Sequence, residues 1–132
     1  MNLFTAAEFV ENYSLIGEKK SEAPTWKLFL LAIFGGLFIG LGGAATSAVS
    51  HSLINVGLIR LVSGLLFPFG LITVMLTGTE LFTGNCLIGI SVLEKRATLG
   101  GMLKNLAVVY VGNFAGSVML AAGCAYFGQM NY

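Results

Sequence analysis

The chain has 132 residues, of which 56% are hydrophobic and only 10% are charged, and its formal net charge is +1. Soluble domains carry roughly 25% charged residues, so this chain cannot cover itself with a polar surface. A net charge this close to zero excludes the basic field that nucleic-acid binding needs, and the high hydrophobicity excludes intrinsic disorder. The composition predicts a membrane protein with the lipid bilayer as its partner and no nucleic acid.

Residues 1–27 are predicted to form a cytoplasmic N-terminal segment that contains a short amphipathic helix. Between Thr5 and Ile16, apolar side chains recur near helical spacing among acidic ones, which is typical of a helix at a membrane surface. Trp26 beside Lys27 is a common interfacial anchor. We expect this segment to position the chain at the membrane rather than to carry chemistry.

Residues 28–132 are predicted to form a membrane half-domain with three spans. The first span, about residues 28–50, contains no charged residue and is long enough to cross a hydrocarbon core of about 30 Å. The second, about residues 61–93, is too long for one straight crossing and is expected to break near residues 77–85. The third occupies about residues 105–127. The predicted fold class is an all-α membrane protein with three transmembrane helices, the second of them broken.

The basic residues lie unevenly around these spans. Only Arg60 falls between the first and second spans, whereas six others flank the opposite ends: Lys19, Lys20, Lys27, Lys95, Arg96 and Lys104. Cytoplasmic flanks collect positive charge, so the N-terminus is expected in the cytoplasm. The predicted location is the inner (plasma) membrane, with a multi-pass topology.

Glycine accounts for 18 of the 132 residues, and many glycines fall inside the spans. Small residues four positions apart let helices approach closely. The pattern fits tight packing within the chain and contacts between copies equally well, and the sequence leaves both interpretations open. The glycines concerned are Gly36, Gly40, Gly42, Gly43, Gly112 and Gly116.

The stretch from Thr77 to Asn85 places two glycines, three threonines, a glutamate and an asparagine at membrane depth. Non-helical backbone survives there only when it is buried in protein or lines a water-filled cavity. Many transporters use such a discontinuous helix to build a binding site. Because a carboxylate facing an anion path would repel the anion, Glu80 is expected to accept loop hydrogen bonds or to pair with a cation, with proton handling as the alternative.

The run from Met75 to Gly84, Met-Leu-Thr-Gly-Thr-Glu-Leu-Phe-Thr-Gly, resembles a signature in the second span of the formate/nitrite transporter family. Members of this family include formate, nitrite and hydrosulfide channels. Residues 64–71 and 104–113 are also similar to the family. The resemblance covers nearly the whole chain, but it matches only the N-terminal half of the family's six spans.

The resemblance implies that the chain is half of an aquaporin-like six-helix inverted-repeat channel, and that the complete protein is a homopentamer. A second three-span half would then be a partner, and it would supply a pore histidine, a neighbouring asparagine and a lysine. The single histidine of this chain, His51, falls at the end of the first span. A loop or interfacial role is expected for it.

The resemblance also implies a substrate pathway. Thr83 matches a threonine that faces the pore centre, and Phe67 and Leu71 match apolar residues that narrow the path on one side. Leu81, near the narrowing on the other side, and Phe82 complete the pathway. The residues expected to support the loop are Gly78, Glu80, Gly84 and Asn85.

The function implied is a channel or transporter, passive or proton-linked, for small monovalent weak-acid anions such as formate, nitrite, hydrosulfide, acetate or lactate. An anion loses several kcal/mol of hydration in an apolar constriction, whereas its neutral acid loses far less. This chemistry predicts a protein that is not an enzyme and has no catalytic residue, metal or cofactor. The alternative is a small non-transporting membrane assembly or regulatory subunit that uses its glycine faces to bind a partner.

Overall fold

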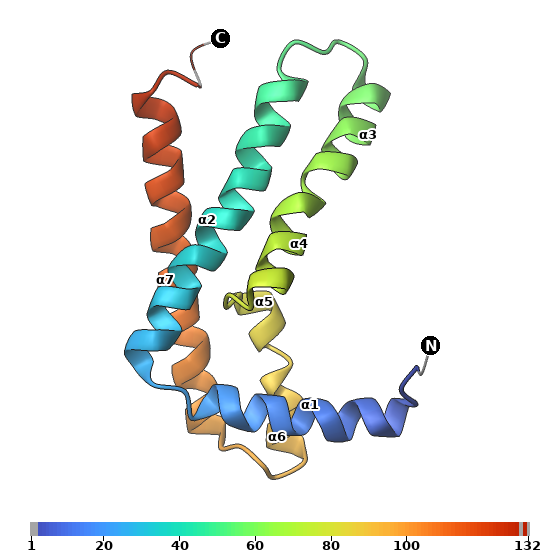
Figure 1. The fold of residues 1–132 in the computed structure, drawn as a ribbon, viewed down its shortest axis with the longest axis vertical. Coiled ribbons are helices and arrows are strands. Elements are labelled where there is room, and N and C mark those ends of the chain that lie inside the picture. Colours follow the sequence, from blue (N-terminus) through green and yellow to red (C-terminus); the bar gives the residue numbers. More distant parts are fainter. Residues whose placement is uncertain (1–2, 130, 132) are drawn as a thin grey trace.

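The computed structural model describes residues 3–129 and 131, and within them the chain forms seven α-helices and no β-strand. Two long helices and a pair of consecutive shorter helices run in the long direction of the molecule, and the first helix lies across one end (Figure 1). In chain order the helices are α1 (Ala6–Ser21), α2 (Thr25–Ser50), α3 (Val56–Leu66), α4 (Pro68–Thr77), α5 (Phe82–Asn85), α6 (Ile88–Leu93) and α7 (Leu99–Tyr126).

Three helical stretches in the described part of the chain are long and apolar enough to cross a membrane. They are α2, the combined stretch α3–α4 from Val56 to Thr77, and α7. The prediction of an all-helical chain with three candidate membrane-spanning helices is therefore confirmed. α7 packs along α2, and α4 packs against α2 on another side.

Two of these helices begin before the charged residues that marked their expected starts. α3 begins after Asn55, whose side chain accepts the N–H of Leu58, so Arg60 lies within a helix. α7 begins after Thr98, which caps it in the same way, and the helix includes Lys104. A capping side chain satisfies the free amides of a first turn, and long basic side chains near a helix end can reach the interface.

α1 begins with a capping box. The Thr5 side chain accepts the N–H of Glu8, and the Glu8 carboxylate accepts the N–H of Thr5 at 2.7 Å. The hydrogen bonds from the Thr5 backbone and side chain lower the pKa of Glu8. Lys19 and Lys20 lie in the last turn, where positive charge complements the helix dipole. The helix thus continues beyond the predicted end at Ile16.

α1 packs against α6. The Ser91 hydroxyl on α6 donates to the Ser14 carbonyl at 2.8 Å, and both serines are buried. A Cβ added to Gly17 would collide with the Ser91 side chain, so glycine is what allows this approach. The N-terminal helix is therefore docked onto the segment that follows the helix break.

The packed centre lies between α2 and α7. A Cβ added to Gly116 on α7 would collide with the Ile33 carbonyl on α2, so the two backbones touch where glycine stands. Gly43, in contrast, faces open space. Close packing within the chain therefore accounts for Gly116 and not for Gly43. The buried apolar cluster here consists of Leu28, Ala32 and Val109.

Candidate functional site

The helical path is interrupted after α4. Gly78 adopts the left-handed conformation, with φ of 66°, and ends the helix. Glycine reaches this conformation without the strain that a Cβ would bring. The chain then continues without helix through Thr79, Glu80 and the extended residue Leu81 before the single turn of α5. This interruption leaves backbone groups that need partners outside their own segment.

Side chains and carbonyls of α2 and α7 supply those partners. The Glu80 N–H donates to the Leu31 carbonyl at 3.2 Å. The Asn113 side chain accepts the Phe82 N–H at 2.9 Å, and it donates to the carbonyls of Ala32 at 2.7 Å and Glu80 at 2.9 Å. Lipid offers no such partners, so these bonds replace the missing helical ones.

The Glu80 carboxylate pairs with Lys20 of α1. The Lys20 Nζ lies 2.7 Å from Glu80 Oε2, and the two side chains are 27% and 11% exposed. Lys20 Nζ also donates to Asn85 Oδ1 at 3.0 Å, and Asn85 Nδ2 donates to Asn105 Oδ1 at 2.8 Å. Asn105 Nδ2 in turn donates to the Lys20 carbonyl at 2.9 Å, which closes the ring of hydrogen bonds. The expected pairing of Glu80 with a cation is thus observed, and it is part of a closed polar network.

α1 makes a second polar contact with the interrupted segment. The Tyr13 hydroxyl donates to the Gly84 carbonyl at 3.1 Å. Burial raises the pKa of Tyr13, and the negative charge of Glu80 raises it further. The phenol therefore remains a neutral hydrogen-bond donor at physiological pH.

All five residues predicted for the substrate pathway line one cavity of about 390 Å³. This apolar cavity lies among α2, α4, α5 and α7. Its lining residues from the predicted pathway are Phe67, Leu71, Leu81, Phe82 and Thr83, and the others are Gly36, Ile39, Asn113 and Ser117. The structure therefore brings together residues that the sequence spreads over two segments.

A second cavity of about 640 Å³ lies between α1, α4 and the interrupted segment. Apolar side chains such as Met75 and Leu87 form part of its lining. We call it the polar cavity after the six polar residues that also line it, which are Tyr13, Lys20, Thr79, Glu80, Thr83 and Asn85. Gly78 and Gly84 also line it. Leu71, Leu81 and Thr83 line both cavities. Thr83 therefore lies where the two cavities adjoin.

Sequence reasoning did not identify Tyr13, Asn113 or Ser117 as site residues, and it treated Lys20 only as a flanking charge. Ser117 donates to the Gly36 carbonyl at 3.3 Å in the wall of the apolar cavity. One signal was available, because Asn105 and Asn113 lie about two helical turns apart on a span without charge. The sequence around Tyr13 and Lys20 shows no pattern that would predict their contacts with Gly84 and Glu80.

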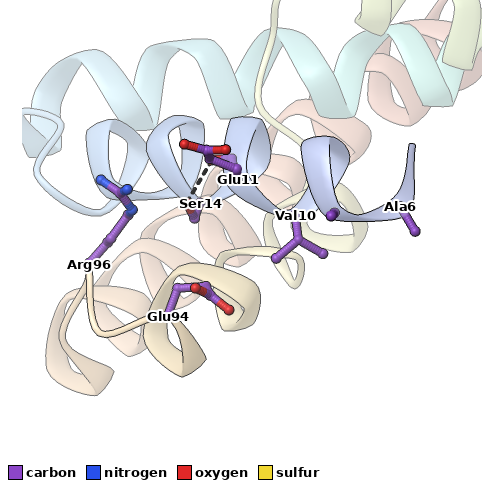
Figure 2. A pocket seen from close by; sticks show the side chains of 7 residues that line it. Ala6, Val10, Glu11, Ser14, Glu94 and Arg96 are labelled. Carbon is purple, nitrogen blue, oxygen red and sulfur yellow. Dashed lines mark hydrogen bonds between the residues drawn. The ribbon is translucent and has the colours of Figure 1, made fainter. Parts of the chain in front are cut away.

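A further cavity of about 600 Å³ lies on α1, away from both cavities of the site. Figure 2 shows Glu94 and Arg96 facing α1, where Ser14 donates to the Glu11 carbonyl at 2.7 Å. None of its lining residues also lines the apolar or the polar cavity. This cavity belongs to the contact between α1 and the end of α6.

Neither a metal cluster nor the histidine forms part of the site. Within residues 3–129 and 131, no three His, Cys, Asp or Glu side chains are grouped so that they could hold a metal ion. His51 follows α2, and its Nδ1 lies 2.9 Å from the Ala48 carbonyl. The chemistry of the site rests on hydroxyl, amide, carboxylate and ammonium groups.

Three candidate spans, one of them followed by a non-helical segment whose backbone bonds to neighbouring helices, define a multi-pass helical membrane protein. The model of the family described as formate/nitrite transporter matches residues 7–132. The chain belongs to the formate/nitrite transporter family, and the resemblance seen in the sequence is confirmed.

Individual relatives agree with this assignment. The chain is 36% identical over 120 residues to a probable formate transporter of Methanothermobacter thermautotrophicus, covering 87% of this chain and 44% of that protein. It is 32% identical over 126 residues to formate channel FocA of Haemophilus influenzae, and the match covers 94% of this chain and 43% of that protein. It is 33% identical over 105 residues to formate channel FocA of Escherichia coli K12, and the match covers 78% of this chain and 37% of that protein. The chain spans less than half the length of these relatives.

Proposed function

We propose that this chain is the N-terminal three-span half of a channel or transporter for small monovalent weak-acid anions such as formate, nitrite or hydrosulfide. Family membership supports formate-type transport, and the relatives' names describe transporters and channels rather than enzymes. The complete protein would be an aquaporin-like inverted repeat of two such halves. It would assemble as a homopentamer in the inner membrane, with its N-terminus in the cytoplasm.

One observation carries the proposal for the pathway. Thr83 lies where the apolar cavity and the polar cavity adjoin, together with Leu71 and Leu81. A hydroxyl at that position can donate a hydrogen bond to an anion's oxygen or accept one from the O–H of a neutral acid. The substrate would therefore meet one polar group between two apolar side chains.

The passage follows from the cost of desolvation. Charged formate would lose several kcal/mol of hydration among Phe67, Leu71 and Phe82, whereas formic acid would lose far less. A cavity beside the polar cavity is lined by three lysines, Lys19, Lys20 and Lys27, and by the two carboxylates of Glu22 and Glu80. The remaining positive charge would raise the local anion concentration. The anion would take up a proton near Thr83, with the proton-exchanging group supplied by the second half.

The test replaces Thr83 by Val, which keeps the volume and removes the hydroxyl. In proteoliposomes that contain this chain with its second half, we expect the formate flux of Thr83→Val to fall about tenfold, the equivalent of one hydrogen bond of about 1.4 kcal/mol. Thr83→Ser should stay near the wild-type flux. A flux of Thr83→Val equal to that of the wild type would remove Thr83 from the pathway.

Thr73→Val is the matched control. The Thr73 hydroxyl donates to the Phe69 carbonyl of its own helix at 2.9 Å, and the residue lines neither cavity. Its replacement should leave the flux unchanged. Size measurement of each variant in detergent separates loss of flux from loss of assembly.

A further inference from the structure

Helix α5 has four residues, too few to be stable by its own backbone bonds. Its position must therefore be fixed from outside. Asn113 holds its first residue through the Phe82 N–H, and Lys20 and Asn105 hold its last through the Asn85 side chain. Between these two anchored ends lie Thr83 and Gly84.

The third anchor of α5 comes from the N-terminal helix. Tyr13 donates its hydroxyl to the Gly84 carbonyl at 3.1 Å, across 71 positions of sequence. The same carbonyl also accepts the N–H of Leu87 at 3.2 Å. Because Gly84 directly follows Thr83, a shift of the Gly84 carbonyl would change the direction of the Thr83 side chain.

The surroundings of Tyr13 suit a lasting anchor. Its ring contacts that of Phe9 at a centroid distance of 5.9 Å on the same helix. α1 itself is held by Ser91 at Ser14 and by Glu80 at Lys20. The turn of α1 that follows Tyr13 is therefore fixed by contacts with two other segments.

We propose that Tyr13 is a positioning residue of the substrate pathway, which sets where α5 presents the Thr83 hydroxyl between the apolar and polar cavities. This inference rests on the proposed function for the role of Thr83. It extends the pathway to α1, a helix that the sequence assigned only to the membrane surface. Tyr13 acts through Thr83 and need not touch the substrate.

The first test is a double-mutant cycle on formate flux, in proteoliposomes containing the chain with its second half. Tyr13→Phe should lower the maximal flux about fivefold, the scale of one net hydrogen bond, and leave the half-saturating concentration unchanged. In the presence of Thr83→Val, adding Tyr13→Phe should cost little more, because one effect acts through the other. If the flux losses of the two single variants multiply in the double variant, the proposal is overturned. It is also overturned if Tyr13→Phe alone has the same flux as the wild type.

The matched control is Tyr126→Phe, at the far end of α7, where the side chain is 85% exposed. It removes the same hydroxyl from a place outside both cavities, so flux should not change. A loss equal to that of Tyr13→Phe would show a general effect of removing a phenol and overturn the assignment.

A second readout does not depend on transport. Amide hydrogen exchange of residues 81–87 should rise at least about threefold in Tyr13→Phe, because α5 loses one of its anchors, while exchange in α7 stays unchanged. Unchanged exchange at residues 81–87 overturns the anchoring role. If the wild type carries no weak acid but Tyr13→Phe still raises this exchange, the proposed function fails and the anchoring of α5 by Tyr13 stands.

Discussion

The Lys20 ammonium lies 2.7 Å from the Glu80 carboxylate, although 60 positions separate the two residues in the chain. One belongs to the helix that lies across the end of the spans, and the other to the segment where the second span is interrupted (Figure 1). A carboxylate at membrane depth must find partners or lose its charge. The N-terminal helix therefore completes the interior of the membrane domain, because it supplies the cation.

Replacing Lys20 by Met should destabilise the assembled protein by about 2 kcal/mol, because Glu80 would remain mostly buried without its cation. Thermal unfolding in detergent measures the effect. The exposed neighbour Lys19 provides the control, and Lys19→Met should change the melting temperature much less. The double variant Lys20→Met/Glu80→Met should recover part of the loss, and a double variant less stable than Lys20→Met would contradict the pairing.

The Asn113 side chain bonds to the Phe82 N–H and the Glu80 carbonyl beside the interruption and to the Ala32 carbonyl inside α2. Asn113→Leu should therefore destabilise the protein by about 3 kcal/mol, because buried polar groups would lose their partners. Asn113→Asp should also be less stable than the wild type, since aspartate keeps the acceptor oxygen and loses both N–H donors. Ser117→Ala, which removes one bond of 3.3 Å in the same wall, should cost less than about 1 kcal/mol. Equal melting temperatures for Asn113→Leu and Ser117→Ala would contradict this role.

The parts of the fold that the sequence predicts are those encoded locally. Apolar length predicts the three candidate spans, and the glycines and polar residues from Thr77 to Asn85 predict an interruption that Gly78 indeed begins. Helix starts were less predictable, because Arg60 and Lys104 suggested boundaries while the caps Asn55 and Thr98 determined them.

The contacts that assemble the site could not be predicted in the same way. Lys20 meets Glu80, and Tyr13 meets Gly84, only because α1 docks onto α6 through Gly17. Such long-range pairs depend on the packing of whole helices and leave no periodic signal in the sequence. The grouping of Phe67 with Thr83 in one cavity was accessible only through the family resemblance.

Lys95 adopts the left-handed backbone conformation, with φ of 59°, in the turn after α6. The following N–H of Arg96 donates to the Ser91 carbonyl at 2.9 Å, as at a helix C-terminus that usually ends with glycine. Lys95→Gly should therefore stabilise the protein by about 0.5 kcal/mol, since relief of strain exceeds the added entropy of the unfolded chain. Arg96→Gly, one position later, should lower the melting temperature. If both variants melt at a lower temperature than the wild type, the backbone of Lys95 is not strained enough for glycine to stabilise the protein there.

The proposed orientation can be tested by chemical labelling of intact cells. In a background with Cys86 and Cys124 replaced, a cysteine at Ser52, in the exposed turn between α2 and α3, should react with an impermeant thiol reagent from outside. A cysteine at Lys95 should react only after the membrane is opened. This follows from the six-to-one distribution of basic residues about the spans. Reversed labelling would mean that the N-terminus lies outside the cell, and the cytoplasmic and outer ends of the proposed pathway would then be assigned the other way round.

The chain expressed alone should carry no weak-acid flux, because both cavities are open on its surface. Phe67 is 47% exposed and Leu71 is 44% exposed, and Thr83 is also exposed. Without a second wall, a polar hydroxyl and the groups of the polar cavity would face lipid, which satisfies none of them. A second half that inserts in the opposite sense would cover this surface.

We do not expect a homodimer to supply that opposite half. Copies of one chain insert in both senses only when their flanking basic residues are nearly balanced, and here the ratio is six to one. We therefore expect purified protein of these 132 residues to give no formate-dependent swelling of proteoliposomes, and co-expression with a second three-span half to restore it. Rapid swelling with the chain alone would mean that identical copies in parallel orientation can enclose Thr83, and the pathway would then lie between copies instead of between two inverted halves.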